Sequence, residues 1–222
     1  MIVVHHLNNS RSQRVLWLLE ELGLEYEIKR YERDPKTHLA PRELRAVHPL
    51  GKSPVVSDGS ETVAESGAII EYVVDRHGRG RLRPADGTKE RLRYTYFMHY
   101  AEGSLMPPLL VKFIFEQIRK SPAPFFVRPI IGKLCDKVGA AYIRPNLELH
   151  ADFLEGELGT RAWFAGDELT AADVQMSYPV EAARSRGAVT DAHPKLAAWL
   201  ERVHARPAFK RALERGGPYE IG

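Results

Sequence analysis

Residues 51–66, GKSPVVSDGSETVAES, constrain the fold more than any other part of the chain. Two short β-prone runs, Val55–Val56 and Glu61–Val63, flank the turn-forming pair Asp58–Gly59. Pro54 stands at the start of the first run, and a strand tolerates proline only where the missing N–H group is not needed. The segment therefore predicts an antiparallel hairpin that the chain enters through a proline.

The residues before this hairpin predict a βαβ unit. Residues 2–7 are rich in β-branched and apolar side chains, and 26–31 supply a second short strand. Between them, Asn9 and Ser10 are good N-cap types, apolar residues then recur at helical spacing, and Gly23 ends the pattern. Two strands joined through a helix are expected to be parallel.

The residues after the hairpin predict only helices. Glu65–Ser66 opens an apolar helix that ends near His77–Gly78, and strand signals nearly vanish from Lys89 onward. Helices are expected over 91–119, 130–141, 144–158, 171–184, 194–205 and 208–214, with Pro107–Pro108 bending or interrupting the first. The predicted fold class is a βαβ–ββα domain over residues 1–82, a linker over 83–89 and an all-helical domain over 90–222.

Composition and charge narrow the class of protein. The 222 residues carry 32 basic and 29 acidic side chains, and a net charge of +3 favours neither a nucleic acid nor a membrane partner. The single cysteine, Cys135, excludes an internal disulfide and a Cys-x-x-Cys pair, which fits a reducing compartment. The start, MIVVHHLNNS, does not match a signal peptide. We therefore expect a cytoplasmic protein.

Several motifs resemble those of one family. HPLGKSPVV and AESGAIIEYV are similar to the glutathione-binding segments of the cytosolic glutathione transferases, and EGSLMPPLL and FAGDELTAADV resemble their helical domain. The likeness covers essentially the whole chain and is greatest to fungal and bacterial members with a Ser-Arg motif after the first strand. It implies a thioredoxin-like N-terminal domain, a cis bond before Pro54, and glutathione as co-substrate without a metal.

The resemblance also implies how glutathione binds. The backbone of Ser53 would pair with the cysteinyl part as an added strand, although family members usually carry Val or Ile there. The helix opened by Ser66 would hold the γ-glutamyl carboxylate at its N-terminus, with Glu65 on the ammonium. Lys52, assisted by His38, would meet the glycine carboxylate.

Three residues are candidates for activating the glutathione sulfur. A free thiol has a pKa of about 8.5, so a donor must favour the thiolate. The Ser-Arg motif places Ser10 first, as a hydrogen-bond donor to sulfur. Other serine-type classes would use position 9, which is Asn9 here, and Ser12 lies a turn further along the helix.

The helical domain offers candidates for the electrophile pocket, which the resemblance puts between the two domains. His99, Met106 and Phe113 are the first choices on the long helix, with Phe125 and Phe126 beyond it. His99, Tyr100 and Glu102 are alternatively candidates for contact with a second subunit, since family members are typically homodimers. Thr170–Asp173 has the form of a helix capping box.

Three functions remain open at this level. The first is a glutathione transferase that holds the thiolate for attack on a hydrophobic electrophile. The second is a glutathione-dependent disulfide or peroxide reductase, and the third is a glutathione-transferase-like binding module without turnover. The Lys52, Pro54, Glu65 and Ser66 set argues against the third function.

Overall fold

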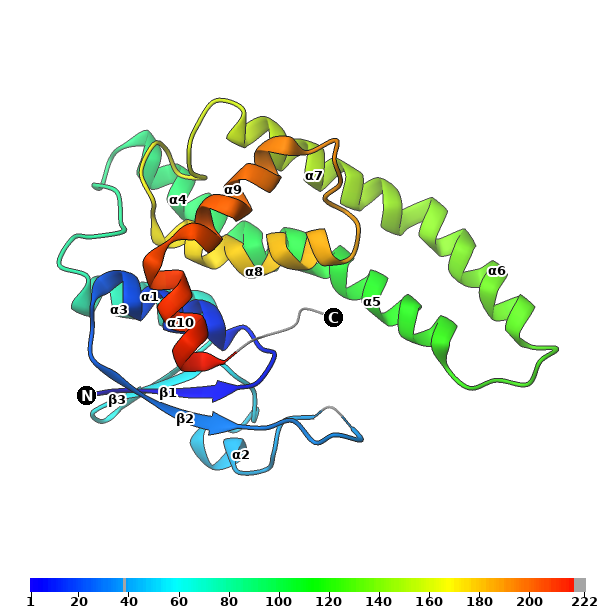
Figure 1. The fold of residues 1–222 in the computed structure, drawn as a ribbon, viewed down its shortest axis with the longest axis horizontal. Coiled ribbons are helices and arrows are strands. Elements are labelled where there is room, and N and C mark those ends of the chain that lie inside the picture. The colour runs from blue at the N-terminus through cyan, green and yellow to red at the C-terminus, as the bar shows by residue number, and fades with distance from the viewer. Residues whose placement is uncertain (38, 218–222) are drawn as a thin grey trace.

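A four-stranded sheet near the N-terminus is followed by a group of helices in the computed structural model, which describes residues 1–37 and 39–217 (Figure 1). The strands are β1 (Ile2–Leu7), β2 (Tyr26–Tyr31), β3 (Val55–Asp58) and β4 (Glu61–Ala64), in the spatial order β2-β1-β3-β4. β1 is parallel to β2 and antiparallel to β3, and β3 and β4 form the expected hairpin. The thioredoxin-like fold class is confirmed.

Three helices complete the N-terminal unit: α1 (Ser12–Leu22), α2 (Leu44–Val47) and α3 (Ser66–His77). α1 ends at Gly23, whose φ of 60° is in the left-handed region that glycine adopts without a Cβ clash. The loops that enter α1 and α3 lie next to the end of β1 and the start of β3. These two loops therefore meet at one side of the sheet.

The remaining elements are helical: α4 (Lys89–Tyr100), η1 (Ala101–Leu105), α5 (Met106–Lys120), α6 (Arg128–Val138), η2 (Gly139–Ile143), α7 (Arg144–Leu158), α8 (Ala171–Ser185), α9 (Pro194–Ala205) and α10 (Pro207–Gly216). The predicted helical second half is confirmed. None of the described helices is long and apolar enough to cross a bilayer. α10 returns to pack on α1, where the Phe209 ring meets Trp17 edge to face at 5.4 Å.

The two segments η1 and η2 are π-helical, and each ends two residues before a proline. Proline lacks an N–H group and clashes with the carbonyl four residues earlier in an α-helix. A π-turn bonds residues five apart and so changes the local partners. Pro107–Pro108 and Pro145 thereby sit in continuous helix, and the expected interruption at 107–108 takes the form of a change in helix type.

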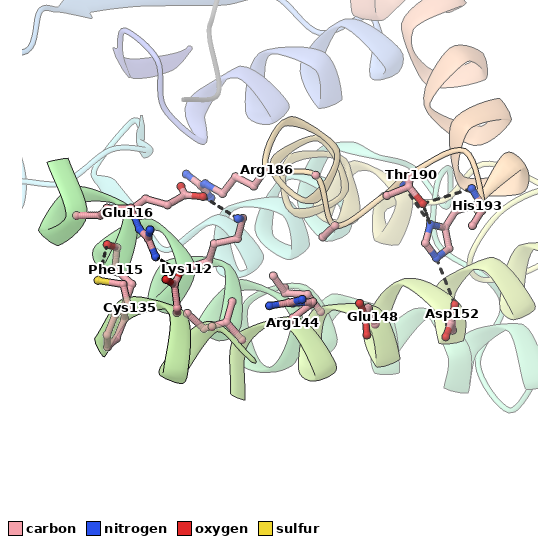
Figure 2. A pocket seen from close by; sticks show the side chains of 18 residues that line it. Lys112, Phe115, Glu116, Cys135, Arg144, Glu148, Asp152, Arg186, Thr190 and His193 are labelled. Carbon is pink, nitrogen blue, oxygen red and sulfur yellow. Dashed lines mark hydrogen bonds and ion pairs between the residues drawn. The ribbon is translucent and has the colours of Figure 1, made fainter. Parts of the chain in front are cut away.

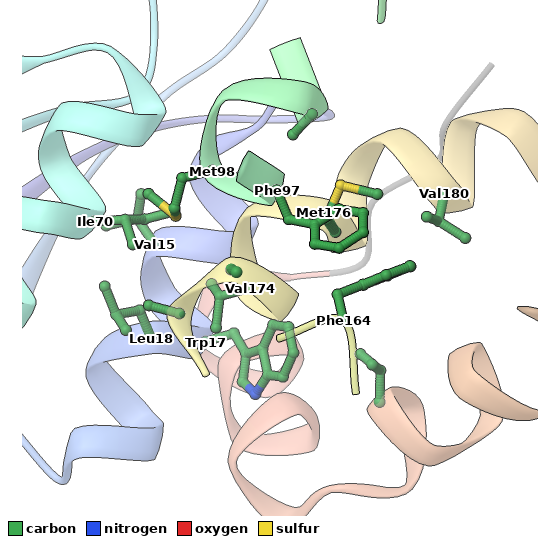
Figure 3. Close-up of a cluster of buried hydrophobic side chains, with 14 of the residues drawn as sticks. Val15, Trp17, Leu18, Ile70, Phe97, Met98, Phe164, Val174, Met176 and Val180 are labelled. Carbon is green, nitrogen blue, oxygen red and sulfur yellow. The ribbon is translucent and has the colours of Figure 1, made fainter. Parts of the chain in front are cut away.

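One hydrophobic core joins both halves of the chain. Figure 3 shows Trp17 and Leu18 of α1 close to Phe164 and to Val174 of α8, and all four side chains are almost fully buried. Because the core is continuous across both halves, it does not mark a boundary between two domains. The domain limits at residues 82 and 90 therefore stay a prediction. The shared core fixes α1, and hence the loop before it, relative to the helical half.

Candidate active site

A cavity of about 240 Å³ lies beside the start of α3 and the loop before β3. Five of the residues predicted to bind glutathione line it: Lys52, Ser53, Pro54, Glu65 and Ser66. The fold therefore brings the hairpin entry and the α3 start to one place, as the sequence motif required. The bond between Ser53 and Pro54 is cis, as the resemblance implied.

Five further residues line the same cavity: Arg11, His48, Leu50, Ala64 and Glu102. Glu102 was a candidate for contact with a second subunit, but its carboxylate reaches this cavity from η1 and binds two arginines of its own chain. Arg11 follows the first-choice Ser10 directly. The Ser-Arg motif could therefore have identified Arg11 as a residue at the cavity.

The Ser53 side chain has a function that sequence reasoning missed. Its hydroxyl donates to the His5 carbonyl at 2.9 Å and accepts from the Leu7 N–H at 3.3 Å. A Val or Ile at this position offers no such bonds. The serine therefore ties the loop before Pro54 to the end of β1, while its backbone remains at the cavity.

The start of α3 provides positive potential at the cavity. Glu65 precedes the helix with a φ of 72°, a left-handed value that is uncommon outside glycine. Ser66 is the first helical residue and is buried. The unbonded N–H groups of a helix start attract an anion. With Lys52 also at the cavity, this wall suits a ligand that carries carboxylates.

Glu102 links the two halves of the molecule at the cavity. It accepts from Arg11 Nε at 3.2 Å and from the Arg14 guanidinium, which is almost fully buried and donates to the Gln175 carbonyl at 2.6 Å. Burial opposes ionisation of Glu102, but Arg14 and Arg11 together hold its pKa below the ordinary value. The carboxylate therefore stays ionised and orients Arg11 at the cavity.

Ser10 belongs to a buried chain of hydrogen bonds. Its hydroxyl oxygen is 2.7 Å from that of Ser12 and accepts from the Ser12 N–H at 3.2 Å. The Ser12 hydroxyl is 2.8 Å from His6 Nδ1, and His6 Nε2 is 3.1 Å from the Gly216 carbonyl. Because the Ser10 hydroxyl is also 3.4 Å from that of the cavity residue Ser53, the chain of hydrogen bonds runs from beside the cavity to the end of α10.

The donor and acceptor of each hydrogen bond in this series can be assigned from the Gly216 carbonyl. A carbonyl only accepts, so His6 Nε2 carries the proton. Burial, and then Arg30, lower the His6 pKa against a smaller opposing effect of the Gly216 carbonyl, so the ring is neutral and Nδ1 accepts from Ser12. Since Ser12 has given its only hydroxyl proton, Ser10 donates to Ser12. To donate to sulfur, Ser10 must turn away from Ser12.

The other two candidates for the thiol are placed differently. Asn9 is exposed with a φ of 48°, and its carbonyl accepts from Arg33 at 3.2 Å. Ser12 is fully buried, and its hydroxyl is engaged with His6. None of the three candidates lines the cavity, but the Ser10 hydroxyl is 3.4 Å from that of Ser53, which does. His38, the predicted helper of Lys52, lies outside the described residues.

The predicted electrophile residues do not gather at one site. His99 borders a shallow depression on α4 with Tyr96 and Tyr100, Met106 is buried in the core, and Phe113 lies under the Arg186 guanidinium at 5.2 Å. None of the three lines the 240 Å³ cavity. The electrophile pocket therefore stays a prediction.

A second cavity of about 790 Å³ lies wholly in the helical half, between α5, α6, α7 and the loop before α9 (Figure 2). It contains ion pairs such as Lys112–Glu116 and the buried thiol of Cys135, whose Sγ is 3.7 Å from the Phe115 carbonyl. It shares no lining residue with the smaller cavity. Cys135 is packed in the interior of the helical half.

Comparisons with known proteins agree with this arrangement. Residues 1–75 match the family model "Glutathione S-transferase, N-terminal domain", and residues 140–207 match "Glutathione S-transferase, C-terminal domain". The chain is 35% identical to glutathione S-transferase 3 of Schizosaccharomyces pombe, over 97% of this chain and 88% of the relative. It is 34% identical to glutathione S-transferase 1 of Saccharomyces cerevisiae, over 97% and 95%.

A solved structure gives the same result. The crystal structure of a glutathione S-transferase from Actinobacillus pleuropneumoniae is 32% identical and superimposes with a TM-score of 0.82, over 99% of this chain and 94% of that one. The fold is a thioredoxin-like domain followed by a helical domain, with a cavity lined by residues of both. The chain belongs to the glutathione S-transferase family, and the resemblance to its fungal members is confirmed.

Proposed function

We propose that this protein is an enzyme that binds glutathione in the 240 Å³ cavity and presents its thiolate to a hydrophobic electrophile. The observation that carries the proposal is the convergence of Lys52, the Ser53 backbone, Glu65 and Ser66 on one small cavity. Glutathione has two carboxylates and one ammonium group. The helix start and the cations of the cavity suit the carboxylates, and the carboxylates of the cavity suit the ammonium group.

Two groups favour the thiolate in this proposal. Ser10, whose hydroxyl is 3.4 Å from that of the cavity residue Ser53, donates a hydrogen bond to sulfur after turning from Ser12, and the Arg11 guanidinium at the cavity adds positive charge. A hydrogen bond to a charged group contributes about 1.5–3 kcal/mol, and the bond given up contributes about 0.5–1.5. The net effect of Ser10 is therefore about 1 kcal/mol, which is about 0.7 pH unit. The positive charge of Arg11 lowers the pKa of the bound thiol further.

Ser10→Ala tests the assignment of the thiol donor. We expect the pH at which bound glutathione ionises to rise by about 0.7 unit, because one donor to the anion is lost. The ultraviolet absorbance of the thiolate, followed against pH, measures the shift. The pH profile of kcat/KM should move by the same amount.

Asn9→Ala is the matched comparison for Ser10→Ala. We expect it to leave the ionisation of bound thiol unchanged, since Asn9 is exposed, whereas the Ser10 hydroxyl lies next to the cavity residue Ser53. Loss of activity in Asn9→Ala together with an unchanged pH profile in Ser10→Ala would show that the donor is Asn9.

Ser66→Ala tests the carboxylate site. We expect the dissociation constant for glutathione to rise about tenfold, because a hydrogen bond to a carboxylate is removed from a buried position. Isothermal titration calorimetry measures it, and Ser60→Ala, in the exposed hairpin turn, is the control. Equal affinities for the two variants would place the carboxylate elsewhere.

The two alternative functions are separated by turnover. A disulfide or peroxide reductase would reduce those substrates far faster than it conjugates a generic aryl halide. A binding module would bind glutathione without either activity. The chain has one cysteine, and it is buried away from the cavity, so a reductase would use bound glutathione twice.

We also infer that the protein is a cytoplasmic homodimer. The apolar depression on α4 includes Leu92 and Tyr96, which are 74% and 49% exposed in the single chain. A second subunit would cover such a surface. The cytoplasmic location rests on the single unbridged cysteine.

A further inference from the structure

The helices α5 and α6, with the connecting residues 121–127, form an arm that projects from the rest of the molecule (Figure 1). The arm ends in Phe125 and Phe126, which are 81% and 65% exposed and contact each other edge to face at 5.5 Å. Ile130, in the first turn of α6, is 67% exposed. These phenylalanines were candidates for the electrophile pocket, and the structure places them at the far end of the arm instead.

The arm is also strongly basic. It carries six cations, Lys112, Arg119, Lys120, Arg128, Lys133 and Lys137, and two carboxylates, Glu116 and Asp136. Both carboxylates are already paired, with Lys112 and Arg119. The other four cations are exposed and form no ion pair among the described residues. Lys120 and Arg128 flank the apolar tip, and Lys133 and Lys137 follow along α6, so the arm carries positive charge that the chain does not neutralise.

We propose that the tip of this arm docks on an anionic lipid surface. Phe125, Phe126 and Ile130 enter the headgroup layer, and Lys120, Arg128, Lys133 and Lys137 meet the anionic headgroups. The net charge of +3 predicted no membrane partner, because acidic residues elsewhere in the chain offset the excess of basic residues in the arm. The inference concerns a surface outside the glutathione cavity and does not depend on the proposed function.

Charge and shape favour lipid over other partners. A second copy related by a twofold axis would bring the patch against itself, so that cations face cations across the contact. Single-stranded nucleic acid stacks its bases on aromatic faces. Here the two rings already contact each other, and the aliphatic Ile130 and Leu134 offer a base no stacking surface. A fluid anionic interface accommodates all of these groups.

Co-sedimentation of the full-length protein with vesicles tests the proposal. Vesicles of phosphatidylcholine with about 30% phosphatidylserine should carry the protein down, and pure phosphatidylcholine vesicles should not. Raising the salt from about 0.1 M to about 0.5 M should weaken binding, because the Debye length shortens. The double variant Phe125→Ser/Phe126→Ser should reduce the bound fraction at least about tenfold.

Two controls distinguish the tip from the rest of the surface. Leu39→Ser, at a residue 67% exposed outside the arm, should bind vesicles like the parent. Unchanged far-ultraviolet circular dichroism and glutathione titration show that the double variant is folded. Equal binding to neutral vesicles, unchanged binding of the double variant, or no binding at all would overturn the proposal. So would dissociation of a dimer by the double variant, or displacement of vesicles by a single-stranded oligonucleotide.

Discussion

Asp173→Ala should destabilise the protein by about 3–5 kcal/mol. The Asp173 carboxylate is fully buried and accepts four hydrogen bonds: from Phe164 N at 2.9 Å, Thr170 N at 3.0 Å, Thr170 Oγ1 at 3.0 Å and Trp199 Nε1 at 3.3 Å. Alanine leaves these donors buried without an acceptor. Relief of the cost of burying the carboxyl group offsets only part of this loss.

Thermal and urea unfolding measure the effect. For a chain of this length, we expect the midpoint temperature to fall by roughly 10 °C. Asp167→Ala is the matched control, because that carboxylate is exposed in the loop that precedes α8. A loss below about 1 kcal/mol in Asp173→Ala would show that the four bonds contribute little net stability.

The same carboxyl group should impose a pH dependence on stability. Burial outweighs the four donors and raises the pKa of Asp173 from 3.8 to about 6. Between these values the folded protein binds the proton and the unfolded chain does not, so stability falls as pH rises from about 4 to about 6. The whole change is about 3 kcal/mol. This fall in the free energy of unfolding should be present in the parent and absent from Asp173→Ala.

The order of the secondary structure followed from local sequence patterns. The βαβ unit, the hairpin and the helices are encoded in the spacing of apolar residues and in Gly23 and Asp58–Gly59, which act over a few residues. The Lys52, Pro54, Glu65 and Ser66 set was also predictable, because its members are neighbours in one loop, hairpin and helix start. The fold needed only to keep them together.

The rest of the site depends on contacts between distant residues. Glu102 reaches the cavity because the shared core sets η1 against α1, and no local pattern near residue 102 records that packing. The proton direction at Ser10 is decided by the carbonyl of Gly216, at the other end of the chain. Exposure of Phe125 likewise depends on how far the arm projects. A sequence pattern shows that a residue is apolar, whereas tertiary packing decides what covers it.

Glu102→Ala should weaken the contact between the N-terminal unit and the helical half, and it should lower the free energy of unfolding by about 3 kcal/mol. The reason is Arg14, which is almost fully buried and loses the carboxylate that compensates its charge. The value lies at the lower end of the range for buried pairs, because the Glu102 side chain is 35% exposed and water screens part of the interaction. Glutathione affinity should fall as well, since Arg11 is no longer oriented at the cavity.

Urea unfolding and calorimetry measure the two effects of Glu102→Ala, with Glu214→Ala on the exposed side of α10 as the control. The pH dependence has the opposite sign to that of Asp173. The folded pKa of Glu102 is below 4.5, so its contribution is present above that pH and is lost as pH falls through the lowered value.

The double variant Glu102→Ala/Arg14→Met separates the value of the ion pair from the cost of an unpaired charge. If the penalty in Glu102→Ala comes from the orphaned guanidinium, replacing Arg14 with an apolar side chain of similar length should restore part of the stability. Glutathione affinity should not recover, because Arg11 still lacks its partner. A double variant less stable than Glu102→Ala would mean that Arg14 stabilises the two halves mainly through its bond to the Gln175 carbonyl.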